Sequence, residues 1–243
     1  MDDGRWNASL VEERVMEIRT KDVAFPANGI EGAGYLAQPD DDGTHPGVIV
    51  IQEWWGLDGH IKDIAERFAR EGFVALAPDM YRGKIATEPD EARKLAMALN
   101  REQALKDLLG SARYLLALPE VGPKKLGCIG FCMGGSLTLA LAISAPEVAA
   151  AAPFYAGFRP GAEELAKIEA ELFCAFGADD GGIPLDQVRI FEETLRSQGK
   201  NAVVKVYDGA PHSFFNDTKE SYRPAAAKDA WEHAVDLFRR TLV

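Results

Sequence analysis

The sequence predicts an α/β fold in which a mostly parallel central sheet is flanked by helices on both faces. Short, continuous apolar runs such as Gly47 to Ile51 are typical of strands that are buried on both faces of a parallel sheet. These runs alternate along the chain with longer segments of helical period, such as residues 61–70. We expect a single domain over residues 15–243, preceded by a mobile polar tail over residues 1–14.

The elements can be placed in order from these periodicities and from the turn residues between them. A Pro-Ala-Asn-Gly turn at residues 26–29 joins the first two strands. The expected strands cover residues 15–25, 30–38, 47–51, 73–77, 126–129, 148–155, 171–176 and 202–207. The expected helices cover residues 61–70, two segments within 89–118, then 136–144, 185–197 and 225–242.

Composition limits the classes of function. The formal net charge of −11 argues against nucleic acid or an anionic membrane as a partner, because both demand a basic surface. Residues 1–17 are polar and acidic, so we expect no export signal there, and no apolar stretch has membrane-spanning length. Its three cysteines form no metal-binding or disulfide pattern and suit a reducing compartment, so we expect a cytoplasmic protein without a metal site.

The most informative stretch is Gly130-Phe131-Cys132-Met133-Gly134, which follows a predicted strand and precedes a predicted helix. This is the setting of the nucleophile elbow, G-x-S-x-G, with cysteine in the position of serine. Glycines allow the strand and the helix to pass close to the turn, and the thiol lies at a helix N-terminus that favours a thiolate. The alternative is a buried structural cysteine, so the pattern becomes catalytic only with a base and an acid elsewhere.

Two histidines follow Cys132 in the chain. His212 lies in a loop directly after the last predicted strand, whereas His233 lies within the closing helix, so His212 is the candidate base. The acid should follow the preceding strand, where Asp179 and Asp180 are adjacent. The residues alone leave both carboxylates open.

Together these motifs give the chain a resemblance to the dienelactone hydrolase family of the α/β-hydrolase fold. The residues that carry it are Gln52-Glu53-Trp54-Trp55-Gly56, Ala77-Pro78-Asp79-Met80-Tyr81, the elbow, Gly177-Ala178-Asp179-Asp180 with Pro184, and Gly209-Ala210-Pro211-His212-Ser213-Phe214. The resemblance implies a Cys132, Asp180 and His212 triad, because the family places its acid three residues after the strand-end glycine. It also implies that Glu53 accepts the thiol proton and releases it when substrate binds.

Further site residues follow from the motif and from the resemblance. The elbow motif assigns one oxyanion donor to the backbone N–H of Met133, and the family position assigns the other to Trp54. The candidate substrate-binding residues are Arg82, Trp55, Tyr81 and Phe214, with Tyr222 and Arg223 on weaker grounds. The family's type substrates carry a carboxylate held by two arginines. Arg82 lies one residue away from one of these positions, and Asn216 occupies the other.

We therefore predict a cysteine hydrolase that cleaves small esters or lactones through an acyl-thioester. Its substrate is a small molecule, and the sequence predicts neither a cofactor nor an oligomeric state. Two alternatives remain, namely a broader carboxylesterase or thioesterase without lactone preference, and a non-catalytic ligand-binding relative with a redox-sensitive thiol.

Overall fold

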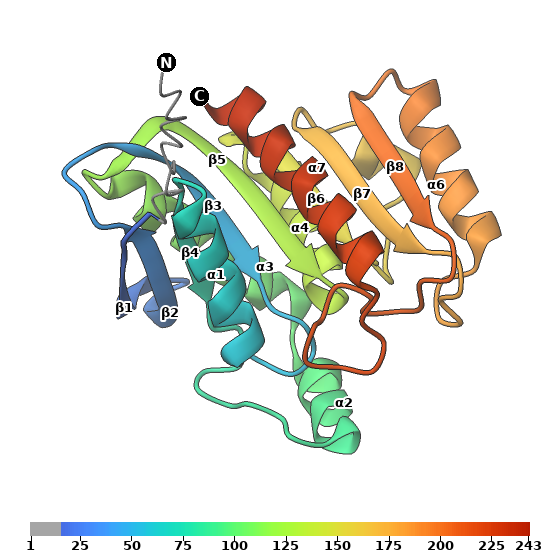
Figure 1. The fold of residues 1–243 in the computed structure, drawn as a ribbon, viewed down its shortest axis with the longest axis horizontal. Helices are drawn as coiled ribbons and strands as arrows, with labels where there is room; N and C mark the ends of the chain where they lie inside the picture. The colour runs from blue at the N-terminus through green and yellow to red at the C-terminus, as the bar shows by residue number, and fades with distance from the viewer. Residues whose placement is uncertain (1–15) are drawn as a thin grey trace, which may run out of the picture.

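The computed structural model describes residues 16–243, so the tail expected over residues 1–14 lies outside the described residues. Eight strands form one sheet in the order β1-β2-β4-β3-β5-β6-β7-β8 (Figure 1). The strands are β1 (Ile18–Ala27), β2 (Ile30–Pro39), β3 (His45–Ile51), β4 (Val74–Pro78), β5 (Val121–Phe131), β6 (Val148–Phe154), β7 (Glu171–Gly177) and β8 (Ala202–Tyr207). All neighbours from β4 to β8 in this order pair in parallel, and only the pairings of β2 are antiparallel, which confirms the predicted mostly parallel sheet.

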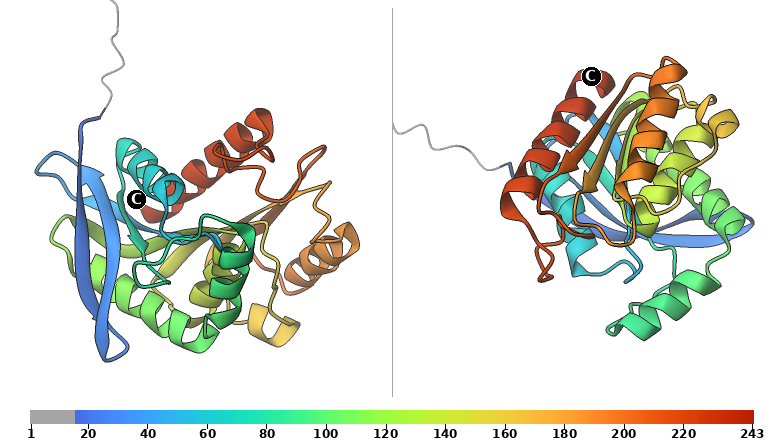
Figure 2. Two further views of the ribbon diagram at one scale, coloured as in Figure 1. Left: turned by 90° about the horizontal axis from the view of Figure 1, so that it is seen from below. Right: turned by 90° about the vertical axis from the view of Figure 1, so that its right-hand side faces the viewer.

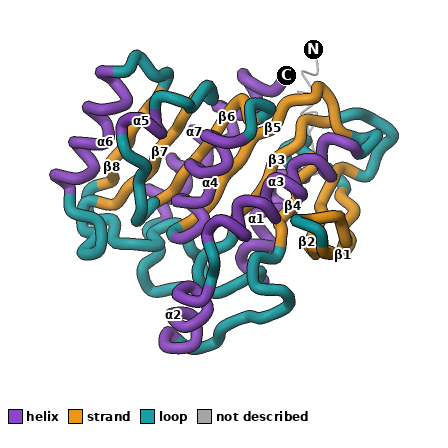
Figure 3. Tube along the Cα trace, turned by 180° about the vertical axis from the view of Figure 1, so that it is seen from behind, coloured by secondary structure: helices purple, strands orange, loops and turns teal. Residues whose placement is uncertain are grey.

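Helices cover both faces of the sheet, as predicted. They are α1 (Gly59–Arg70), α2 (Pro89–Ala98), α3 (Arg101–Ala117), α4 (Met133–Ser144), α5 (Ala162–Leu165), α6 (Leu185–Ser197) and α7 (Pro224–Leu242). The right-hand view of Figure 2 shows α1 and α7 on one face and α3, α4 and α6 on the other. Figure 3 shows that the β1–β2 hairpin and β8 lie at opposite edges of the sheet.

The first hairpin extends further toward its turn than the sequence suggests. β1 runs through Pro26 to Ala27, and the turn consists of Asn28 and Gly29 alone, both with positive φ (49° and 77°). Such a two-residue turn matches the twist of the flanking strands. Pro26 fits inside β1 because β1 is an edge strand, where a missing N–H donor costs nothing.

Two further boundaries and one short helix also differ from the expectations. β5 begins at Val121, five residues before the apolar run that predicts it, because the residues from Gly122 to Lys125 are at least partly exposed and interrupt the apolar pattern. α4 begins at Met133, directly after the elbow cysteine, and not at Ser136. The four-residue helix α5 was not predicted, since a single turn carries no periodicity.

The buried strands bring their carboxyl ends to one edge of the sheet, where ligands bind in open α/β sheets. The side chains of β3 from Gly47 to Ile51 are buried, and the loops after β3, β5, β7 and β8 all leave from this edge. Helix α2 projects past the same edge (Figure 1). Of the helices in residues 16–243, none is long and apolar enough to cross a membrane.

Candidate active site

Cys132 occupies the turn between β5 and α4, where it is the N-cap residue of α4. Its φ of 55° lies in the left-handed region, which a non-glycine residue enters at a cost of about 1–3 kcal/mol. The backbone N–H of Cys132 donates to Phe154 O at 3.1 Å, which holds this conformation against the neighbouring strand. The side chain is partly exposed, so the turn presents a thiol to solvent at a helix N-terminus.

The two glycines of the elbow are required by close backbone approach. A Cβ on Gly130 would lie 2.3 Å from Gly134 O, and a Cβ on Gly134 would lie 2.4 Å from Gln52 O. Both distances are far below any real contact between a Cβ and an oxygen, so a side chain at either position would move β3 or α4. The packing of β5 and α4 against the end of β3 therefore requires glycine at both positions.

Asp180 and His212 meet next to the elbow. Asp180 Oδ2 lies 2.6 Å from His212 Nδ1, and the Asp180 side chain is almost fully buried. The other carboxylate oxygen of Asp180 accepts the N–H of Gly182 at 2.8 Å, which fixes the group in its loop. Asp179 is exposed, with its own N–H bonded to Ala210 O, so it makes no contact with His212.

His233, the other histidine in this half of the chain, lies elsewhere. It is on α7, where its Nδ1 bonds Asp229 O at 2.8 Å and its ring stacks on Phe173. The structure thus brings Asp180 and His212 together with Cys132 and leaves Asp179 and His233 outside the constellation.

The electrostatics of His212 follow from these neighbours. Desolvation lowers the pKa of His212, but hydrogen bonds to Asp180 and to the Cys132 side chain outweigh it and raise the pKa to about 10. The site therefore favours the imidazolium form at neutral pH.

The other two cysteines differ in kind from Cys132. Cys128 and Cys174 are fully buried, and burial raises the pKa of both thiols. A thiol that stays protonated is a poor nucleophile, so Cys132 is the one cysteine suited to attack. Within residues 16–243 there is no group of three His, Cys, Asp or Glu side chains arranged to hold a metal ion.

Glu53 follows β3 and is 1% exposed. Its carboxylate accepts hydrogen bonds from Asn216 Nδ2 at 2.6 Å, Ser213 Oγ at 3.1 Å and Tyr155 Oη at 3.2 Å. Three donors compensate the burial of this charge, which would otherwise be costly. Among the described residues, the hydrogen bonds of Glu53 run to these donors and not to Cys132.

Asn216 explains how this carboxylate is held. Its amide nitrogen faces Glu53, while its Oδ1 accepts bonds from the N–H and the hydroxyl of Thr218, at 3.0 and 2.6 Å. Because Asn216 and Ser213 lie in the loop that carries His212, Glu53 ties that loop to the end of β3. Tyr155 also packs edge-on against the His212 ring, with centroids 5.1 Å apart.

The two residues expected to supply the oxyanion donors, Met133 and Trp54, line the same pocket as Cys132. Met133 is the first residue of α4, so its N–H has no partner within the helix. The Trp54 side chain lies with Cys132 in the lining of one pocket. In the part of the chain that the structure describes, neither backbone N–H donates to another group.

The expected substrate residues divide into two groups. Tyr81 stays near the thiol, with its hydroxyl 3.3 Å from Met133 Sδ, and burial together with the Cys132 charge raises its pKa. Phe214 is fully buried beneath Tyr155, and Trp55 packs against Trp54 and Lys219, so neither lines the pocket.

Arg82 also lies away from the pocket lining. It has a positive φ of 54° in the turn that Asp79 caps, and its guanidinium bonds Asp107 Oδ2 at 2.7 Å and Glu31 O at 3.3 Å. The exposed Arg223 bonds carbonyl groups of its own loop, and Tyr222 lines a smaller separate hollow against α7.

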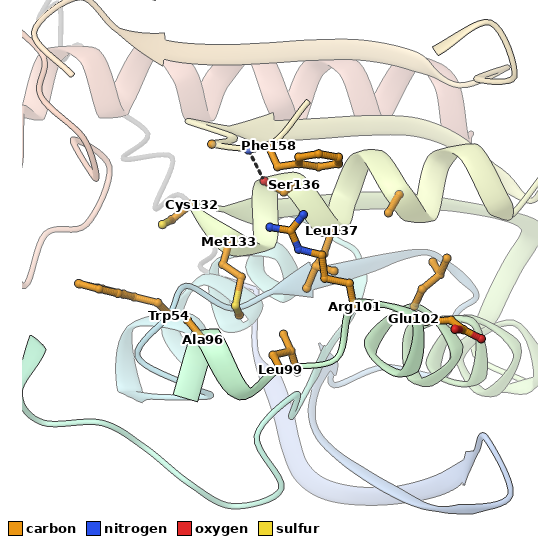
Figure 4. Close-up of a pocket in the computed structure, with 13 residues that line it drawn as sticks. Trp54, Ala96, Leu99, Arg101, Glu102, Cys132, Met133, Ser136, Leu137 and Phe158 are labelled. Atoms are coloured by element: carbon orange, nitrogen blue, oxygen red, sulfur yellow. Dashed lines mark hydrogen bonds between the residues drawn. The ribbon is translucent and has the colours of Figure 1, made fainter. Parts of the chain in front are cut away.

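A pocket of about 710 Å³ opens beside Cys132 (Figure 4). Sequence reasoning missed most of its lining, which comes from α2, α3, α4 and the loop after β6. The lining residues are Trp54, Ala96, Leu99, Arg101, Glu102, Leu105, Cys132, Met133, Ser136, Leu137, Ala140, Gly157 and Phe158. No local signal marks these residues, because α2 and α3 are ordinary amphipathic helices until the fold brings them against α4.

Known proteins resemble this chain in sequence and in fold. The family model described as the dienelactone hydrolase family matches residues 33–242. A Synechocystis protein named "Putative carboxymethylenebutenolidase" is 37% identical over 244 residues, covering 93% of this chain and 99% of that protein. "Protein usf" of Aquifex pyrophilus is 40% identical over 233 residues, covering 90% of this chain and 98% of that protein.

Solved structures agree with the sequence relatives. The "Putative Dienelactone Hydrolase" of Klebsiella pneumoniae has a TM-score of 0.86 at 30% identity, covering 92% of this chain and 99% of that one. A dienelactone hydrolase-like promiscuous phosphotriesterase from metagenomic libraries has a TM-score of 0.85 at 25% identity, covering 93% of this chain and 99% of that one. The family model spans the sheet from β3 to β8 and every loop of the site, so the chain belongs to the dienelactone hydrolase family and has the α/β-hydrolase fold.

Proposed function

We propose that this member of the family hydrolyses small carboxylic esters or lactones with Cys132 as the nucleophile, His212 as the proton carrier and Asp180 as the group that orients His212. Membership of the family makes the chain a hydrolase of ester or lactone bonds. The observation that supports the mechanism is the 2.6 Å contact between Asp180 and His212 beside a partly exposed thiol in an elbow turn.

In acylation, the Cys132 sulfur attacks the carbonyl carbon of the ester while its proton resides on His212. The carbonyl π electrons move to oxygen, and the resulting oxyanion is stabilised by the N–H groups of Met133 and Trp54. When the tetrahedral intermediate collapses, the C–O bond to the alcohol breaks and the imidazolium gives its proton to the leaving oxygen. The products of this half-reaction are a free alcohol and a thioester on Cys132.

Deacylation uses the same groups in the reverse sense. Neutral His212 takes a proton from water, and the water oxygen attacks the thioester carbonyl. The C–S bond then breaks, the carboxylic acid leaves, and the sulfur and imidazolium are restored. For a lactone, the alcohol and the acid remain in one hydroxy-acid product.

Glu53 has a positioning role in this proposal. Its hydrogen bonds with Tyr155, Ser213 and Asn216 hold the His212 loop against the end of β3. The family's use of this glutamate as an acceptor of the thiol proton would require the carboxylate to exchange one of these donors for Cys132. Measuring the reactivity of the Cys132 thiol in a Glu53 variant tests whether that exchange matters.

A broader carboxylesterase or thioesterase is the second candidate. The pocket beside Cys132 is lined mainly by apolar side chains, and the expected arginine Arg82 pairs with Asp107 outside it. A site of this kind accepts acyl groups by shape and apolar contact, which favours no particular lactone ring.

The test is hydrolysis of a panel of small esters, thioesters and lactones by the wild-type protein, Cys132→Ala and Cys132→Ser. We expect turnover by the wild type and its loss by about 1,000-fold or more in Cys132→Ala. Wild-type activity on esters and thioesters with none on lactones would favour the second candidate. An inactive wild type, or full turnover by Cys132→Ala, would sink the cysteine-hydrolase proposal and leave a ligand-binding relative.

A further inference from the structure

The pocket beside Cys132 extends along one face of α4. Met133, Leu137 and Ala140 line it at helical spacing, and Ala140 lies about 10 Å along the helix from Met133 at the usual rise per residue. Figure 4 shows Cys132 at one end of this row and Arg101 beyond Met133. A group bound covalently to the Cys132 sulfur would therefore have an elongated space before it.

The side walls of this space are apolar. Leu99, the residue after α2, and Leu105, in the second turn of α3, are half-buried against the core. Phe158 lines the side formed by the loop after β6. Apolar walls bind a hydrocarbon chain and leave a charged or strongly hydrated chain without partners. The pocket thus selects an acyl group whose middle portion is aliphatic.

Arg101 is the single cationic residue in the pocket lining. Its guanidinium lies 4.7 Å from the centroid of the Phe158 ring. The N–H of Phe158 donates to Ser136 Oγ at 3.0 Å, so the ring that supports the guanidinium is itself tied to α4. These contacts direct the Arg101 side chain into the pocket, as Figure 4 shows.

In the part of the chain that the structure describes, no carboxylate neutralises Arg101. Among residues 16–243 its guanidinium makes no ion pair with a carboxylate, although the chain carries an excess of 11 negative charges. The pocket's one acidic residue, Glu102, is paired with Lys106 at 2.6 Å. Arg82, by contrast, is engaged by Asp107.

Helix stability does not explain this arginine either. Arg101 is the first residue of α3, where the macrodipole disfavours a cation and favours an acid. Asn100 already caps the helix by accepting the Gln103 N–H. A cation at this position, supported on an aromatic ring and facing an apolar pocket, is arranged for an anionic group on a ligand.

We propose that Arg101 binds a carboxylate at the distal end of the acyl group, so that the preferred substrates are half-esters of aliphatic dicarboxylic acids. The proposal rests on the proposed function. Water is consumed, the ester C–O bond breaks, and the products are an alcohol and a dicarboxylate, with one proton released. The aliphatic spacer lies along α4 between the scissile carbonyl at Cys132 and the free carboxylate at Arg101.

The experiment compares two p-nitrophenyl esters that have the same eight-carbon acyl chain. The octanoate ends in a methyl group, and the suberate half-ester ends in a carboxylate. Their kcat/KM values are measured for the wild type, Arg101→Gln, Arg101→Lys and Arg113→Gln. Arg113 is a matched control because it lies exposed on the same helix but does not line the pocket. Thermal unfolding of each variant confirms that it is folded.

We expect Arg101→Gln to lower kcat/KM for the half-ester by about tenfold, mainly through KM, and to change the octanoate by less than about twofold. Arg101→Lys should retain most of the half-ester activity, and Arg113→Gln should affect neither ester. Equal losses on both esters, or none on the half-ester, would overturn the proposal while leaving the hydrolase function in place.

A binding measurement on inactive variants tests the carboxylate site independently of the proposed hydrolase function. Monomethyl suberate is titrated calorimetrically into Cys132→Ala and into Cys132→Ala with Arg101→Gln, neither of which needs to turn over. An affinity about tenfold weaker in the double variant supports the carboxylate site even if the wild type hydrolyses neither ester. Equal affinities would refute the site whatever the activity.

Discussion

The side chain of Asp180 reaches His212 with an oxygen-to-nitrogen distance of 2.6 Å, while its neighbour Asp179 is exposed and makes no contact with the ring. Consecutive side chains in the loop after β7 point apart, so only one of the two carboxylates can face the loop after β8. The short contact occurs at a buried carboxylate, where a charge-assisted hydrogen bond both orients the imidazole and stabilises its protonated form. The asymmetry between the two acids makes the role of Asp180 directly testable.

Asp180→Asn should lower kcat at least about 100-fold, because an amide keeps the geometry but no longer stabilises the imidazolium. Asp179→Asn is the matched control and should change kcat less than about twofold, since that side chain is solvated. Steady-state kinetics on one activated ester measure both values. Similar losses in the two variants, or a larger loss in Asp179→Asn, would contradict the assignment.

The pKa of His212 predicts how stability depends on pH. Its value of about 10 in the folded protein lies above the value of about 6.5 expected in the unfolded chain. A raised pKa stabilises the folded state fully below pH about 6.5, and this contribution is lost as pH rises through about 10. Urea unfolding of the wild type and His212→Gln should therefore show a free-energy difference that is largest at pH 6 and shrinks toward pH 10.

The same comparison on an Asp180→Asn background supplies the control for this pH effect. Without the Asp180 carboxylate, which helps raise the pKa of His212, the free-energy difference caused by His212→Gln should already be lost at a lower pH than in the wild-type background. A difference that grows with pH, or one that is unaffected by Asp180→Asn, would show that the His212–Asp180 contact does not hold the proton.

Glu53 should restrain the reactivity of the resting thiol. Glu53 is a buried carboxylate. Burial, together with the nearby charges of Glu53 and Cys132, raises the pKa of Tyr155, which shows that both groups act on the same small region. Glu53→Gln removes this negative charge and favours the thiolate, so iodoacetamide should alkylate Cys132 about three- to tenfold faster between pH 6 and 9.

Glu193→Gln, a substitution at an exposed position of α6, is the control for this measurement. Cys128 and Cys174 are buried and should stay unmodified, so the observed rate belongs to Cys132. Unchanged or slower alkylation in Glu53→Gln would limit Glu53 to holding the His212 loop.

The order of the strands and helices could be predicted because each buried strand carries its own apolar run. β3 and α6 occur where the periodicity predicts them, and the loops after β3, β5, β7 and β8 carry the motifs that meet at one edge of the sheet. The meeting of Cys132, His212 and a carboxylate after β7 was open to prediction because parallel strands present their carboxyl ends together. The choice of Asp180 over Asp179 came from the family resemblance.

The pocket could not be predicted, because its lining depends on how α2 and α3 pack against α4. Arg82 is close to a substrate position in sequence, but the turn capped by Asp79 directs it toward Asp107. Arg101 belongs to no recognisable motif. It lines the pocket because it is the first residue of α3, and the fold places this end of α3 at the pocket. Likewise, the three donors to Glu53 come from two separate loops, and a single sequence contains no signal that joins them.

The central claim, that Cys132 carries the acyl group, is tested most directly by intact-protein mass spectrometry of acid-quenched reactions with an activated aryl ester whose acyl-enzyme hydrolyses slowly. The account predicts a mass increase of one acyl group per chain, located by peptide mapping on Cys132, together with a burst of one equivalent of the released phenol. Continued turnover with Cys132 unmodified, or an acyl group found on another residue, would contradict it.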